Sequence, residues 1–131
     1  MKRILCDTNI YSYALKGDKE IISILRKASF IGFASISIGE LLSGFKSGGR
    51  EVKNREELDD FLDSPRVRIY SVDENTAEYY AEILNNLRQI GLPIPTNDIW
   101  IAAIAFQYGL KMFTKDIHFK YIPGLPLITE F

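Results

Sequence analysis

The sequence predicts an α/β fold, specifically a three-layer α/β/α sandwich in which helices cover both faces of a parallel sheet of about five strands. Short apolar runs, expected for strands buried on both faces, alternate along the chain with longer segments that carry apolar residues at helical spacing. Such alternation favours a parallel sheet with right-handed crossovers. The length of 131 residues, with no repeat or internal linker, predicts one domain over residues 1–131.

The first half of the chain has the patterns of two strands and four helices. We expect, in order, a strand at Ile4–Cys6, a helix started by Thr8 and Asn9, a helix over Lys19–Lys27, a strand over Phe30–Ile36, a helix opened by Ser37, and a charged helix over about 51–63. A pair of glycines separates the last two helices, because glycine is a poor helix former.

The second half of the chain predicts three more strands and two more helices. We expect a strand over Val67–Val72, a helix capped by Asp73 that ends near Gly91, a stiff link at Leu92–Pro95, a helix introduced by Thr96 and Asn97 that runs through Tyr108 with one apolar stripe, and strands at Lys111–Thr114 and Leu125–Thr129.

The composition is that of a soluble globular protein, with 47% apolar and 25% charged residues. Its 16 basic and 17 acidic residues leave a net charge of −1, so nucleic-acid binding would need local basic patches or a bound metal. The single cysteine, Cys6, excludes an internal disulfide and is expected as a buried thiol. No apolar stretch is long enough for a membrane span and no signal peptide precedes the first strand, so we expect a cytoplasmic protein.

Four acidic residues lie where strands end or helices begin, namely Asp7, Glu40, Asp98 and Asp116. Ligands of parallel α/β sheets bind at the carboxyl ends of the strands. The topology places Asp7, Glu40 and Asp116 at that common edge, and Asp98 joins them only if its helix begins there. We therefore expect a shared acidic pocket.

Each of these acids also has a purely structural explanation. Asp7 and Asp98 lie where acids stabilise the N-terminus of a helix. Glu40 fits a capping box with Ser37, in which the glutamate side chain accepts from the backbone N–H of the cap. Asp116 could be a turn or cap residue. These explanations treat each acid separately and do not require all four to lie where strands end. Asp73 also follows a strand, but we expect it to be a simple helix cap.

Converging carboxylates repel one another unless a cation or protons neutralise them. Oxygen ligands without a Cys or His cluster favour Mg²⁺ or Mn²⁺ over Zn²⁺. Such ions promote phosphodiester hydrolysis and require no nucleophilic side chain or histidine. The only histidine, His118, is expected at the surface.

The ordered motifs resemble those of the PIN domain family of metal-dependent nucleases, and in size and pattern the VapC-type toxins of toxin–antitoxin pairs. The matching segments are Leu5-Cys6-Asp7-Thr8-Asn9, Ser37-Ile38-Gly39-Glu40-Leu41, Asn97-Asp98-Ile99-Trp100-Ile101-Ala102-Ala103 and Thr114-Lys115-Asp116-Ile117-His118-Phe119. They span nearly the whole chain in the family's order.

The resemblance implies a Mg²⁺- or Mn²⁺-dependent endoribonuclease with a PIN-like fold. By resemblance, Asp7 and Asp98 are the principal metal ligands, Glu40 binds metal through water or orients the attacking water, and Asp116 completes the site. Hydrogen bonds from a set of neighbouring polar side chains would hold these carboxylates in place. That set is Thr8, Asn9 and Thr114.

The resemblance further implies an RNA substrate, a cognate antitoxin protein and a homodimer. The segment around Gly48-Gly49 carries four basic residues that could contact RNA phosphates or simply face solvent. These residues are Lys46, Arg50, Lys53 and Arg55.

Other functions stay open at this point. A PIN-type nuclease could act in RNA processing, and a non-catalytic module could use the acidic groove only to hold a partner. A phosphatase is disfavoured, because Asp7-Thr8-Asn9 lacks the second aspartate of an Asp-x-Asp motif.

Overall fold

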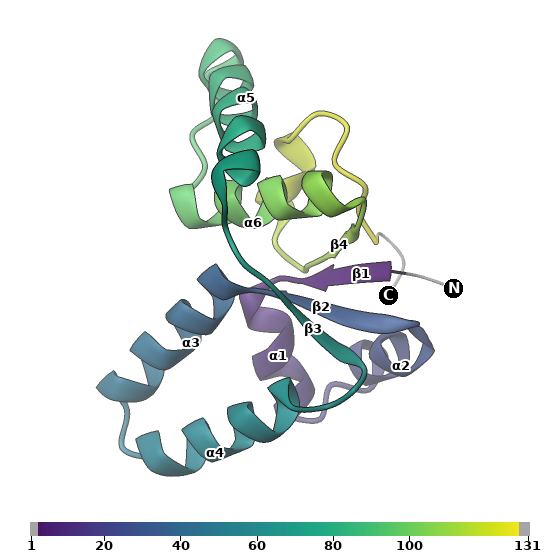
Figure 1. Ribbon diagram of the computed structural model, residues 1–131, viewed down its shortest axis with the longest axis vertical. Helices are drawn as coiled ribbons and strands as arrows, with labels where there is room; N and C mark the ends of the chain where they lie inside the picture. Colours follow the sequence, from purple (N-terminus) through teal and green to yellow (C-terminus); the bar gives the residue numbers. More distant parts are fainter. Residues whose placement is uncertain (1–2, 129–131) are drawn as a thin grey trace.

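The computed structural model describes residues 3–128 and contains one parallel sheet of four strands (Figure 1). The strands are β1 (Arg3–Cys6), β2 (Phe30–Ala34), β3 (Val67–Tyr70) and β4 (Lys111–Phe113), in the spatial order β3-β2-β1-β4. All three pairings are parallel. The predicted α/β class is confirmed, although the sheet has four strands where about five were expected.

Helices cover both faces of the sheet, as predicted (Figure 1). On one face lie α1 (Thr8–Leu15), α2 (Lys19–Lys27), α3 (Ser35–Ser47) and α4 (Glu51–Leu62). On the other face lie α5 (Glu74–Ile90), α6 (Thr96–Tyr108) and the 3-10 helix η1 (Ile117–Tyr121). Within the described residues, no helix combines the length and apolarity needed to cross a membrane.

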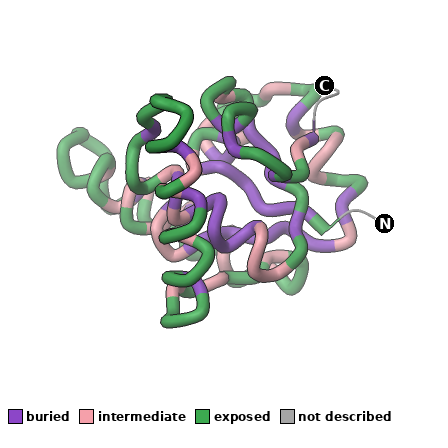
Figure 2. The backbone as a smooth tube through the Cα atoms, turned by 90° about the horizontal axis from the view of Figure 1, so that it is seen from above, coloured by how far each residue is buried: buried purple, intermediate pink, exposed green. Residues whose placement is uncertain are grey.

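Two apolar cores lie on opposite faces of the sheet because successive side chains of a strand point to opposite sides. In β1, Leu5 packs into the core beneath α5 and α6, whereas Ile4 and Cys6 pack into the core beneath α1 and α2. Cys6 is buried as expected, and this burial raises the pKa of its thiol. Figure 2 shows the buried chain running through the centre of the molecule.

Helix α6 differs from the single apolar stripe expected for it. Residues Ile101 to Ala105 are all buried, with 0% exposure, so the helix is enclosed on most of its surface. It packs against α5 on one side and the sheet on the other (Figure 1). Small alanines permit this close double packing, which fixes the position of the first turn of α6.

Several predicted boundaries are shifted by one or two residues. Strand β2 ends at Ala34 rather than Ile36, and α3 consequently begins at Ser35 rather than Ser37. The expected ends of the third and fourth strands, Val72 and Thr114, lie just beyond β3 and β4. Asp73 caps α5 as predicted, since its carboxylate accepts from the N–H groups of the first turn.

The predicted fifth strand at Leu125–Thr129 is wrong for the residues that the structure describes, and Thr129 lies outside them. Leu127 forms only an isolated parallel bridge with Met112. The Met112 N–H donates to the Pro126 carbonyl and the Ile128 N–H donates to the Met112 carbonyl. Proline has no N–H, so Pro126 cannot extend this ladder in the other direction.

We predict that Gly32→Ala destabilises the fold by about 1–3 kcal/mol, the usual range for overpacking. A Cβ at position 32 would lie 2.8 Å from the backbone oxygen of Ile4 and 3.0 Å from the Tyr70 ring. Urea denaturation measures the change. The control is Gly39→Ala in α3, where a Cβ meets nothing within 4 Å and should stabilise the helix by about 0.5–1 kcal/mol. Equal stability of the two variants would contradict this packing.

Candidate functional site

A pocket of about 640 Å³ lies at the carboxyl edge of the sheet, and the structure brings all four predicted acids to its wall. Asp7 follows β1, Glu40 lies in α3, Asp98 lies in the first turn of α6, and Asp116 follows β4. Asp98 was expected to join the other acids only if its helix begins at this edge, and α6 does begin there. Four segments that are distant in the sequence therefore contribute one carboxylate each.

Asp7 is the most enclosed of the four acids, with 6% exposure. Its Oδ1 accepts a 2.8 Å hydrogen bond from the Thr8 N–H, and its Oδ2 accepts a 2.8 Å bond from the Thr114 hydroxyl. Burial raises the pKa of Asp7, these two bonds lower it, and the charges of Asp116 and Glu40 raise it further. Asp7 also caps α1, so its structural explanation holds together with its place in the pocket.

Glu40 does not cap its helix, so the capping-box explanation is wrong. The residue at the N-cap of α3 is Ala34, which has no side-chain cap, and Ser37 lies inside the helix. The Thr8 hydroxyl instead donates a 2.7 Å hydrogen bond to Glu40 Oε1. A second bond of 2.9 Å joins the hydroxyls of Thr8 and the fully buried Ser37. Helix α1 thereby holds the carboxylate of α3.

Asp98 is partly buried and lies close to the other three acids. Burial, and then the negative charges of Asp7, Asp116 and Glu40, raise the pKa of Asp98 to about 6. The N-cap of α6 is Pro95, which provides no side-chain hydrogen bond, so Thr96, expected to introduce the helix, is its first residue and not its cap. The raised pKa shows that the four carboxylates share one electrostatic environment.

Asp116 caps the 3-10 helix η1 and is held from two directions. Its Oδ1 accepts from the His118 N–H at 2.9 Å and lies 2.7 Å from His118 Nδ1. The Asp116 N–H donates to the Thr114 hydroxyl oxygen at 2.9 Å. His118 lies at the surface as expected, with 51% of its side chain exposed, but it also contacts the acidic site. The sequence motif contained both residues and did not reveal this contact.

The supporting residues expected around the carboxylates are only partly engaged. Thr8 and Thr114 hydrogen-bond to Glu40 and Asp7, and Asn9 lines the pocket. Ser37, which the sequence predicts as a helix cap, is an additional supporting residue through its bond with Thr8. The contact between Ser37 and Thr8 depends on the packing of α1 against α3, which the local sequence pattern does not predict.

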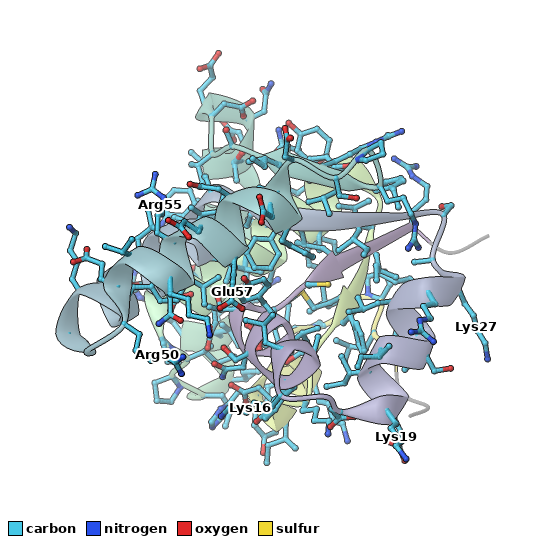
Figure 3. All side chains as sticks on the ribbon, turned by 90° about the horizontal axis from the view of Figure 1, so that it is seen from below. Lys16, Lys19, Lys27, Arg50, Arg55 and Glu57 are labelled. Atoms are coloured by element: carbon cyan, nitrogen blue, oxygen red, sulfur yellow. The ribbon has the colours of Figure 1, made fainter. Side chains whose placement is uncertain are left out.

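The four basic candidates for RNA contact do not line the acidic pocket. Lys46 pairs with Glu51 and Arg55 pairs with Asp59, each at 3.2 Å on the exposed surface. Arg50 precedes α4 and Lys53 lies in its first turn, both exposed. Figure 3 shows Arg50 and Arg55 on the outside of the α4 region.

The pocket offers oxygen donors of the kind that Mg²⁺ and Mn²⁺ prefer. Among residues 3–128, however, no group of three or more Asp, Glu, His or Cys side chains is arranged to hold an ion by itself. Mg²⁺ in proteins is usually bound by one or two carboxylates, several waters and substrate phosphates. The donor set therefore fits a partly hydrated ion better than a closed protein cage.

An acidic pocket at the carboxyl edge of a parallel sheet, wrapped by these six α-helices, agrees with the family suggested by the motifs. The sequence model of the PIN domain family matches residues 4–125 of the chain, so the chain belongs to this family. The resemblance inferred from the sequence motifs is confirmed.

Named relatives cover nearly the same length. The chain is 33% identical over 128 residues to "Ribonuclease VapC2" of Rickettsia felis, covering 94% of each chain. It is 31% identical over 99 residues to "Ribonuclease VapC4" of Mycobacterium tuberculosis, covering 75% of each. The crystal structure of Rickettsia felis VapBC2 bound to a promoter DNA fragment matches with a TM-score of 0.83 and 32% identity, over 95% of this chain and 96% of that one. The DNA-bound VapBC of Salmonella typhimurium shares the fold, with a TM-score of 0.87, 24% identity and 98% coverage of both chains.

We predict that Thr114→Val destabilises the protein by about 1–3 kcal/mol, because it leaves a buried oxygen of Asp7 without its donor. Thr114→Ser is the matched control, since it retains the hydroxyl. Chemical denaturation of both variants at neutral pH measures the difference. If the valine variant is as stable as the serine variant, the Thr114–Asp7 bond contributes nothing to the fold.

Proposed function

We propose that the protein is a Mg²⁺- or Mn²⁺-dependent endoribonuclease that hydrolyses RNA phosphodiester bonds and acts as the toxin of a toxin–antitoxin pair. The observation that carries the proposal is the convergence of Asp7, Glu40, Asp98 and Asp116 on one pocket. The ribonuclease names of relatives that are at least 30% identical support the same reaction.

Each carboxylate has a distinct part in the proposed reaction. Asp7 and Asp98 hold the cation, and Asp116 completes the site. When bound, the cation supplies Lewis-acid stabilisation of the negative charge that develops on the scissile phosphate. Glu40, with one oxygen held by Thr8, uses its second oxygen to orient the attacking water.

The hydrogen bonds around the acids support this division of labour. Asp7 is fixed through both oxygens, which favours a constant ligand geometry. Asp98 has a pKa of about 6, so a bound cation would favour its ionised form at neutral pH. Because repulsion disfavours full ionisation of the four carboxylates without a counter-charge, the pocket is suited to binding a cation.

An antitoxin partner is the second part of the proposal. Neighbouring structures described as VapBC complexes, and one described as a toxin–antitoxin complex from Klebsiella pneumoniae, support it. A homodimer and a role in growth control are expected from the same resemblance and remain predictions.

We predict that Asp7→Asn and Asp98→Asn each reduce RNA cleavage by more than about a hundredfold, because each removes a proposed cation ligand. Asp98→Asn should stay folded because the amide relieves charge repulsion, whereas Asp7→Asn keeps only one of its two accepted hydrogen bonds and should fold with lower stability, which circular dichroism checks before activity is measured. Cleavage of labelled RNA with Mg²⁺, Mn²⁺ or EDTA measures activity. Thermal melting with and without Mg²⁺ gives an independent measure of binding.

The control for charge loss is Asp60→Asn, an exposed residue of α4 that is outside the pocket. It should cleave like the parent and show the same rise in melting temperature with Mg²⁺. Equal cleavage by the parent and both pocket variants, or parent activity that persists in EDTA, would refute the metal-dependent nuclease.

We predict that expression of the protein slows bacterial growth and that co-expression of the adjacent reading frame's product restores it. Expression of Asp7→Asn should leave growth unchanged, because growth arrest requires RNA cleavage. Growth curves together with co-purification measure both effects. Growth inhibition by Asp7→Asn equal to that of the parent would instead favour a module that acts by binding alone.

A further inference from the structure

The edge of the sheet opposite the acidic pocket is strongly basic. The stretches 3–6, 25–34, 64–72 and 109–114, which carry the four strands, contain six Lys and Arg residues and no Asp or Glu. We call these residues the basic edge: Arg3, Arg26, Lys27, Arg66, Arg68 and Lys111, all of them exposed. A chain with a net charge of −1 thus separates its charges across the sheet.

The strand register brings two of these cations onto one aromatic ring. Arg3 pairs with Phe30, and Arg68 pairs with Gly32, two residues further along β2. The guanidinium carbons of Arg3 and Arg68 lie 5.5 Å and 4.2 Å from the centroid of the Phe30 ring. Two like charges are therefore held together over a ring that is 7% exposed.

Arg66 connects the end of α2 to the same surface. Its guanidinium donates to the carbonyls of Leu25 and Ala28, both at 2.7 Å. These two bonds hold the end of α2, which carries Arg26 and Lys27, beside the start of β3. Figure 3 shows Lys27 at the outer end of α2. Arg66 is used in capping α2, and Arg26 and Lys27 lie in the last turn of that helix, where cations stabilise its C-terminus.

No cation of the basic edge forms an ion pair within the described part of the chain. The ion pairs found there use Lys46, Arg55, Lys115 and His118 as cations. Arg3 and Arg68 have a structural role, because their apolar stems cover the Phe30 ring. Stabilisation of the α2 C-terminus explains Arg26 and Lys27 separately, but neither explanation requires all six cations to lie at one edge. Clustered cations without counter-charges are typical of surfaces that bind nucleic-acid phosphates.

We propose that the basic edge binds the phosphates of a structured RNA whose cleaved strand lies in the acidic pocket; the choice of RNA rests on the proposed function. Strands of four or five residues separate the two edges by roughly 13–17 Å. A stem–loop can place an unpaired loop strand in the pocket and its stem phosphates along the basic edge. A short unstructured RNA occupies the pocket alone.

The test compares binding and cleavage of two RNAs of equal length, a stem–loop and an unstructured strand. Binding is measured by fluorescence anisotropy in EDTA over a range of salt, so it is independent of nuclease activity. The parent should prefer the stem–loop. Arg68→Met, which keeps apolar cover over Phe30, should lower the salt slope of log K by about 0.7–0.9 for the lost phosphate contact. Its affinity at moderate salt should fall about threefold.

Arg88→Gln is the matched control, because it removes one exposed charge from the last turn of α5, outside the basic edge. It should bind like the parent. With active protein and Mg²⁺, Arg68→Met should raise KM for the stem–loop and leave cleavage of the unstructured strand unchanged. Equal losses for Arg68→Met and Arg88→Gln, or equal affinity of the parent for the stem–loop and the unstructured strand, would overturn the proposal. Absence of cleavage with intact stem–loop binding would refute only the nuclease.

Discussion

The burial of the Asp7 carboxylate is the constraint on which the site depends. Asp7 ends the central strand β1, and its N–H continues the ladder by donating to the Phe113 carbonyl at 2.9 Å. Its two side-chain oxygens are bonded to Thr8 and Thr114, at the start of α1 and the end of β4. Burying a charge is costly unless donors satisfy it. Here the donors come from the two elements that must meet for the pocket to exist, so the pocket and the fold are formed by the same contacts.

Structural and functional uses of the acids are not alternatives in this protein. Asp7 caps α1 and Asp116 caps η1, yet both line the pocket. A helix N-terminus at a strand exit provides backbone N–H groups that hold one oxygen of the carboxylate and leave the other for different partners. Capping and site chemistry are competing explanations at the level of sequence, but in the structure capping is a means of fixing the site.

The sequence was sufficient for the order of the four strands and six α-helices, because buried parallel strands and amphipathic helices have distinct periods, but it also predicted a fifth strand that the described residues do not form. It could not locate the junction between β2 and α3, since Ile36 has a strand-like side chain inside a helix. That shift of two residues changed Glu40 from a cap to a residue held by Thr8. Contacts such as Thr8 with Glu40 join positions 32 residues apart, so they depend on tertiary packing that no local pattern encodes.

The near-zero net charge conceals the electrostatic organisation that distinguishes the two edges of the sheet. Carboxylates gather at the ends of the strands, where Asp98 has its pKa raised to about 6, while cations gather at their starts. An RNA phosphate entering the acidic pocket is repelled until positive charge offsets the four carboxylates. In the proposed function, a bound cation would supply that charge locally, and the basic edge would supply attraction at a distance from the chemistry. The cation would then govern cleavage, and the basic edge would govern which RNAs stay bound long enough to be cleaved.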